Sequence, residues 1–178
     1  VVCPADCSEI VKVVNAASEF EGPMYIRLTG AVGNPPVYTE DYDFIIGKSI
    51  TLREGKDITI FAHGTMVFES LEAARILEDQ NVSATVVNMH TLKPLDFDAI
   101  DKALSTSKAI VTVEEHSVIG GLGSAISEYT SQFPNNPVQL TIGLPDKFGK
   151  TADYRFLLEK YRLTGKKIAE DIIKFVYK

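Results

Sequence analysis

Several features are scarce or absent in this chain of 178 residues, and each absence narrows the class of protein. No apolar run approaches the roughly 20 residues that a membrane-spanning helix needs, and the first residues lack the basic and apolar regions of a secretory signal. Tryptophan is absent, so other residues anchor the core. Basic residues are outnumbered, 18 against 24 acidic ones, which gives a formal net charge of −6. We therefore expect neither a membrane protein nor a protein that grips nucleic acid through a basic face.

Cysteine is also scarce, because the chain contains only Cys3 and Cys7. No histidine lies near these thiols in the sequence, which makes them a poor zinc site. A disulfide between residues four apart in this context is unpromising. We expect two reduced thiols and a cytoplasmic location.

Complete catalytic motifs are missing as well. The sequence has no H-E-x-x-H metal motif and no G-x-S-x-G nucleophile turn. The run Gly120-Gly121-Leu122-Gly123 differs from both G-x-G-x-x-G and the Walker pattern. Backbone N–H groups of such a run, placed before a helix, could cradle an anion. Alternatively, the glycines let a loop turn tightly and approach a neighbouring backbone closely.

Strand-like and helix-like segments alternate from residue 49 onward. Strands are expected at 50–53, 57–63, 84–89, 109–113 and 138–142. Helices are expected at 67–80, after Asp96, at 123–133, at 153–161 and after Thr164-Gly165. Apolar strands separated by amphipathic helices are typical of a parallel sheet covered on both faces. The pattern predicts an α/β domain over residues 49–178, with three α/β/α layers and a mostly parallel five-stranded sheet.

The first 30 residues resemble a fragment of a larger α/β sheet. Ser8 is the expected N-cap of a helix that ends at Gly22-Pro23, and Met24–Leu28 is expected to form a strand. A strand end, a helix and a strand make one crossover unit, which cannot bury both of its faces alone. We expect the full-length protein to continue upstream. Residues 31–48, stiffened by two adjacent prolines, are predicted to be a linker.

Polar residues gather where the predicted core strands end, the place where open α/β sheets bind ligands. His63, His90 and His116 all lie there, and Glu114 and Glu115 precede the last of them. No spacing typical of a metal site accompanies these residues, so hydrogen-bonded histidines are expected instead. Adjacent glutamates on a strand point to opposite faces, which argues against a paired acid and base. Residue chemistry alone thus gives no complete catalytic set.

Several stretches together resemble the C-terminal domain of transketolase-like enzymes. They are residues 61–67, 86–96 (VVNMHTLKPLD), 112–116 with 120–125, and the closing 153–161 with 163–165. Upstream, Pro4-Ala5-Asp6 and residues 22–28 (GPMYIRL) are similar to the last crossover of that family's pyrimidine-binding domain. The resemblance implies that residues 1–30 are a remnant of that domain, followed by the linker and the C-terminal domain.

This resemblance also implies a function for the full-length protein. Such enzymes use thiamine diphosphate and Mg²⁺ to move a two-carbon ketol unit between sugars, with the cofactor between two protomers. The family's G-D-G motif followed by Asn is absent here, and the glutamate that activates the cofactor would lie upstream of Val1. We therefore expect this fragment to bind no cofactor and to be inactive. Its expected role is to support a homodimer, with the N-terminal portion or subunit of the same enzyme as partner.

The resemblance implies roles for particular residues too. Glu114, Glu115, His116, Gly120, Gly121 and Gly123 correspond to interface or packing elements, and His63 and His90 are placed with them. No catalytic, cofactor-binding or metal-binding residue is expected. Gly30 stands where transketolases typically have an arginine that holds the substrate phosphate, whereas Arg27 matches an earlier arginine of related enzymes. Arg27 is therefore predicted to lie beside the substrate, the alternative being a structural ion pair.

Two alternatives remain open. The chain could be the C-terminal part of 1-deoxyxylulose-5-phosphate synthase or of a 2-oxoacid dehydrogenase beta subunit, which are similar in the same stretches. It could also be a free-standing regulatory module that binds an anionic metabolite at its glycine-rich loop.

Overall fold

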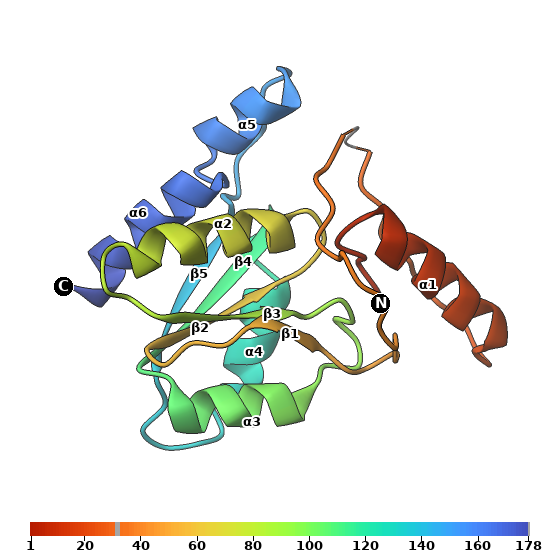
Figure 1. The fold of residues 1–178 in the computed structure, drawn as a ribbon, viewed down its shortest axis with the longest axis horizontal. Coiled ribbons are helices and arrows are strands. Elements are labelled where there is room, and N and C mark those ends of the chain that lie inside the picture. Colours follow the sequence, from red (N-terminus) through yellow and green to blue (C-terminus); the bar gives the residue numbers. More distant parts are fainter. Residues whose placement is uncertain (31–32, 178) are drawn as a thin grey trace.

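The computed structural model describes residues 1–30 and 33–177, and one five-stranded sheet forms its centre (Figure 1). In spatial order the strands are β1 (Ile50–Arg53), β3 (Ala84–Asn88), β2 (Ile58–Ala62), β4 (Ala109–Ser117) and β5 (Val138–Leu144). β1 runs antiparallel to β3 at one edge, and the other neighbouring pairs are parallel. The predicted sheet is confirmed.

Helices cover both faces of this sheet. On one face lie α2 (Met66–Glu78) and α6 (Gly165–Val176), with α5 (Tyr154–Lys160) beside them, and on the other lie α3 (Phe97–Thr106) and α4 (Leu122–Thr130) (Figure 1). The predicted three-layer α/β/α architecture is therefore confirmed. None of the described helices is long and apolar enough to cross a membrane.

Alternate residues of the central strands supply two apolar cores. Ile60 on β2 packs into the core beneath α2 and α6, together with Leu77 and Ile168. Phe61, the next residue, points to the opposite face and joins Ile126 in the core beneath α3 and α4. All residues of β2 are buried, which explains why its sequence is continuously apolar apart from one threonine.

The N-terminal helix α1 (Cys7–Glu19) lies outside these layers (Figure 1). The prediction that Ser8 caps this helix is wrong. Asp6 is the N-cap, and its carboxylate accepts the backbone N–H of Glu9 at 2.9 Å. The Ser8 hydroxyl donates to the same carboxylate at 2.7 Å. Aspartate and serine are comparably good N-caps, and Asp6 takes this position because its backbone is extended whereas the helix already begins at Cys7.

The expected strand at Met24–Leu28 is reduced to a single parallel bridge between Val2 and Ile26. The N–H of Val2 donates to the carbonyl of Tyr25 at 2.9 Å, and the N–H of Arg27 donates to the carbonyl of Val2 at 2.8 Å. Pairing stops there, because Pro4, the next residue that faces this neighbour, has no N–H to donate. On the other side of the segment, Cys3 donates its N–H to the carbonyl of His90 at 2.7 Å. The N-terminal segment thus crosses onto the edge of the layered domain.

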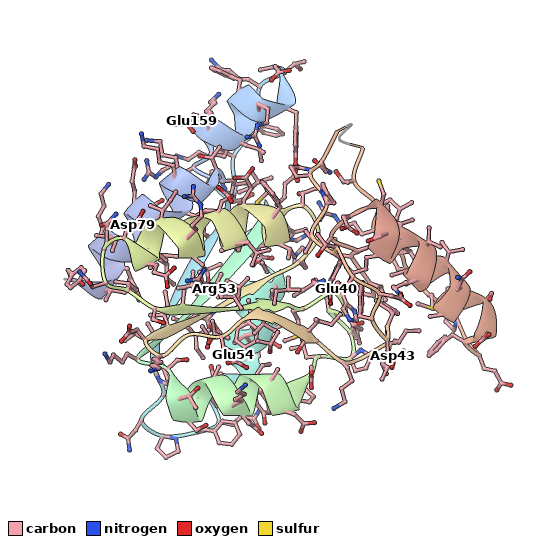
Figure 2. The ribbon with its side chains drawn as sticks, in the orientation of Figure 1. Glu40, Asp43, Arg53, Glu54, Asp79 and Glu159 are labelled. Carbon is pink, nitrogen blue, oxygen red and sulfur yellow. The ribbon has the colours of Figure 1, made fainter. Side chains whose placement is uncertain are left out.

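The chain between α1 and β1 contains no regular element among its described residues, and Ala31 and Val32 of the predicted linker lie outside them. Its acidic residues Glu40 and Asp43 are exposed to solvent (Figure 2). The segment is nevertheless attached to the rest of the fold, and one attachment is to the cap of α1. The carboxylate of Asp6 accepts the N–H of Val37 at 2.7 Å and the N–H of Tyr38 at 3.2 Å.

Candidate functional site

The candidate site lies where the carboxyl ends of β2, β3 and β4 meet the N-terminal segment. Cys3 connects the two regions, because its carbonyl accepts the N–H of Gly64, just after β2, at 3.2 Å. All histidines of the chain are at this edge, as their positions after the strands indicated. His63 and His90 are buried, and His116 is half-buried.

Glu114 is fully buried and caps helix α4. Its carboxylate accepts the N–H of Leu122 at 2.8 Å and the N–H of Gly123 at 2.8 Å. Burial acts to raise the pKa of Glu114, but His63 and these two N–H groups hold it below its usual value. The negative charge lies at the positive end of the helix, where it is stabilising.

This cap decides between the two interpretations of the glycine-rich loop. A side chain at Gly121 would collide with the Glu114 carboxylate, and one at Gly123 would come within 2.6 Å of Thr141. Both glycines therefore permit close approach within the fold. The N–H groups that an external anion would need are already bonded to Glu114. The hypothesis of an anion-binding module built on this loop is not supported.

Glu115 points away from Glu114, as the alternation of strand side chains predicted. Its Oε2 accepts hydrogen bonds from the Thr65 hydroxyl at 2.6 Å and from the Tyr154 hydroxyl at 2.8 Å. Burial is the main cause that raises the pKa of Tyr154 to about 12, and the nearby Glu115 carboxylate acts in the same direction. The ring Nδ1 of His116 donates to the carbonyl of Ser117 at 2.8 Å, and the imidazole remains 43% exposed.

Arg27 and Cys3 line a small cavity of about 120 Å³ with His63, Thr65 and Glu115. Arg27 donates from Nη2 to the carbonyl of Glu115 at 2.8 Å and approaches Cys3 Sγ with Nη1 at 3.7 Å. Within the described part of the chain no carboxylate pairs with this guanidinium. The described residues therefore do not support the alternative that Arg27 forms a structural ion pair.

His63 connects this cavity to the helix cap. Its Nε2 lies 3.9 Å from Glu114 Oε2, and its side chain is 1% exposed. Burial acts to lower the pKa of His63, but Cys3 and Glu114 raise it to about 9. Conversely, burial acts to raise the pKa of the Cys3 thiol, but His63 and Arg27 lower it.

A larger cavity of about 430 Å³ adjoins the first one, sharing Thr65. An ion pair between Glu69 Oε1 and Arg155 Nη1 at 2.7 Å lies at its wall. The other carboxylate oxygen of Glu69 accepts the N–H of Gly165 at 2.6 Å, which fixes the start of α6. Sequence reasoning missed Cys3, Thr65, Glu69 and Tyr154 as site residues, and only Thr65 carried a signal, its place after a core strand.

Neither cavity offers a metal site. Across residues 1–30 and 33–177, no group of three or more His, Cys, Asp and Glu side chains could hold a metal ion. The G-D-G motif of the family is also absent from the sequence. The residues present therefore do not fit a Mg²⁺–diphosphate centre.

Comparison with known proteins decides the family. A family model described as the transketolase C-terminal domain matches residues 47–168. The chain belongs to this transketolase family. Among relatives, it is 35% identical to one subunit of the apulose-4-phosphate transketolase of Phocaeicola vulgatus, covering 100% of this chain and 56% of the relative. It is 40% identical to 1-deoxy-D-xylulose-5-phosphate synthase of Dictyoglomus thermophilum, covering 96% of this chain and 28% of the relative.

A solved structure gives the same result for this transketolase-family chain. A split-gene transketolase, described as an inactive β4 tetramer, has a TM-score of 0.88 and 41% identity, covering 97% of this chain and 55% of that one. The chain thus spans about half the length of this structure and of the Phocaeicola vulgatus transketolase subunit. The predicted identity of a transketolase C-terminal section is confirmed.

Proposed function

We propose that this chain is the C-terminal part of an enzyme that transfers a two-carbon ketol unit between sugars. The observation that carries the proposal is the match, over the whole chain, to one subunit of a sugar-phosphate transketolase. Thiamine diphosphate, bound with Mg²⁺, would supply the carbanion chemistry. Because the described residues contain no metal-ligating group, we propose that both are held by polypeptide outside this chain.

Arg27 is the residue we assign to the substrate. Its guanidinium is held in place by the Glu115 carbonyl and borders the 120 Å³ cavity. A fixed, always charged guanidinium without a carboxylate partner suits a phosphate or another anionic group. In this proposal Glu115 acts as a positioning residue, because its backbone carbonyl orients the guanidinium.

Two surfaces are proposed to meet other polypeptides. His116 and Gly120 are the members of the predicted interface set that reach the surface most fully, whereas Glu114, Gly121 and Gly123 are occupied inside the fold. We assign His116 and Gly120 to contact with a second copy in a homodimer. Val11 and Val14 on α1 are 60% and 52% exposed, and we propose that the remainder of the pyrimidine-binding domain covers them.

The proposal predicts that ketol transfer needs the complete protein. The chain alone and the complete enzyme are to be compared with thiamine diphosphate, Mg²⁺, a ketose phosphate donor and an aldose phosphate acceptor. Product is expected only from the complete enzyme. Turnover by the chain alone would overturn the proposal that the cofactor and Mg²⁺ are held outside this chain. The relative described as an inactive β4 tetramer is consistent with the expected result.

A second function is favoured by one observation, the 40% identity to a 1-deoxy-D-xylulose-5-phosphate synthase. Arg27, at the earlier arginine position of related enzymes, agrees with it. Supplying the complete enzyme with pyruvate and glyceraldehyde 3-phosphate distinguishes the two functions. Consumption of pyruvate, with no transfer from ketose phosphates, would replace the first proposal by the second.

A further inference from the structure

The cavity beside Arg27 contains a thiol, that of Cys3, which the proposed ketol transfer does not use. Cys3 is 4% exposed and lines this cavity, with Arg27 Nη1 at 3.7 Å from its sulfur. Cys7, four residues later, is exposed and is not among the residues that line this cavity. The two cysteines of the chain therefore differ in environment.

His63 lines the same cavity and is a second, independent indication of a reactive site there. Its side chain is 1% exposed, and within the described residues neither ring nitrogen has a hydrogen-bond partner. Buried polar groups are normally satisfied, so an unpartnered imidazole that lines a cavity calls for a proton acceptor or a small polar ligand there. Glu114 Oε2, at 3.9 Å from Nε2, favours the protonated imidazolium.

Two positive groups thus flank the sulfur of Cys3. The guanidinium of Arg27 and the imidazolium of His63 lower the pKa of the thiol against the effect of burial. Positive neighbours that stabilise the thiolate are the usual cause of a reactive cysteine. The cavity of about 120 Å³ also has room for a molecule of a few non-hydrogen atoms, because a water molecule takes about 30 Å³ in the liquid.

We propose that Cys3 is a peroxide-reactive thiolate, served by His63 within this cavity. The thiolate sulfur attacks one oxygen of hydrogen peroxide, the S–O bond forms and the O–O bond breaks. Sulfur loses two electrons, and the peroxide is reduced. The leaving hydroxide takes a proton from the His63 imidazolium and departs as water. A dithiol returns the sulfenic acid to the thiol, releases water and is itself oxidised to a disulfide.

The test compares the two thiols in matched variants of the full chain. Cys7→Ser leaves Cys3 alone, and Cys3→Ser leaves Cys7 alone as the control. Each folded variant is treated with hydrogen peroxide between pH 6.5 and 8.5 and then unfolded in denaturant that contains dimedone, which traps the sulfenic acid for measurement by mass spectrometry. We expect the rate at which hydrogen peroxide oxidises Cys3 to change less than about twofold over this pH range. The Cys7 rate is expected to rise about tenfold per pH unit below an ordinary thiol pKa.

A rate for Cys3 that rises with pH as steeply as that of Cys7 would overturn the proposal, and so would the absence of a Cys3 adduct. In the Cys7→Ser background, His63→Gln is expected to make the rate of Cys3 oxidation rise steeply with pH. This result would show that the imidazolium, and not burial alone, sets the reactivity of the thiol. If that variant does not fold, the profiles of the two single-thiol variants still decide the question. A bulky aromatic disulfide reagent is expected to label Cys7 and spare Cys3, because it exceeds the cavity. None of these measurements depends on ketol transfer.

Discussion

The N-terminal region and the layered domain differ in how completely they bury their apolar side chains. In the layered domain both faces of the sheet are covered, and side chains such as Ile60 and Phe61 are fully buried. In the N-terminal region α1 packs on one side only, and Val11 and Val14 remain more than half exposed. The comparison teaches that the layered domain completes its own core, whereas α1 presents an apolar face suited to another polypeptide.

A network of polar contacts helps to attach the N-terminal region, in addition to the apolar packing of Ala5 and Val37 in the core beneath α2 and α6. Glu9 is fully buried and accepts the N–H of Ala5 at 2.6 Å and the amide of Asn88, at the end of β3, at 2.9 Å. The hydroxyls of Tyr38 and Tyr42 donate to the same carboxylate at 3.1 Å and 2.9 Å. Burial is the dominant influence and raises the pKa of Glu9. This network joins helix, linker and sheet at one point.

The largest contrast is expected from truncating one apolar side chain in each region. Phe61→Ala removes a fully buried ring from the core beneath α3 and α4 and is expected to lower the free energy of unfolding by about 3–5 kcal/mol. Val14→Ala on α1 is expected to change it by less than about 0.5 kcal/mol. Urea unfolding of the chain measures both. Equal decreases in the free energy of unfolding would mean that α1 unfolds cooperatively with the layered domain.

An intermediate effect is expected from the cap of α4. Glu114→Gln keeps the shape but removes the charge that accepts two backbone N–H groups, at an expected cost of about 1–3 kcal/mol at pH 7. Because folding lowers the pKa of Glu114, its contribution is complete above the unfolded value of about 4.3 and disappears as the pH falls through the folded value.

Unfolding curves at pH 7 and below pH 4 check this prediction. The difference between wild type and Glu114→Gln should shrink in acid. Glu115→Gln serves as the control, because Glu115 accepts two hydroxyl groups and caps no helix, so a smaller loss is expected at pH 7. A difference for Glu114→Gln that stays constant with pH would exclude the charged cap.

An effect no larger than that of the α4 cap is expected where the linker contacts Glu9. Tyr38→Phe removes the hydroxyl that contacts Glu9 and Asn88, and should cost about 1 kcal/mol. Hydrogen exchange should accelerate at the amides of Val37 and Tyr38, which donate to Asp6, and not in β2. Uniform acceleration across the chain would show that the linker is not attached separately.

The sequence predicted those features that depend on local pattern. β2, β3 and β4 were found because strands covered on both faces are continuously apolar. The opposite directions of Glu114 and Glu115 follow from strand geometry alone. The choice of Asp6 over Ser8 as cap was missed, because both residue types are good caps and only the backbone conformation distinguishes them.

The candidate site was harder to predict, because its contacts join segments far apart in the chain. Cys3 and His63 meet only when the N-terminal segment crosses the end of β2, and no pattern near residue 3 indicates this. The glycine-rich loop was open to two interpretations until Glu114, eight residues before Leu122, was seen to occupy its N–H groups. Arg27 beside a substrate, the interface set, the domain boundaries and the cytoplasmic location stay predictions.

Hydrogen exchange of α1 tests the central contrast most directly. The amides of residues 7–19 are to be followed in the chain alone and in the complete enzyme, with β2 as the internal reference. The account predicts that exchange in α1 slows at least about tenfold in the complete enzyme, while β2 is unchanged, because local opening depends on the packing of each element. Equal protection of α1 in both samples would contradict the claim that its apolar face is completed by another polypeptide.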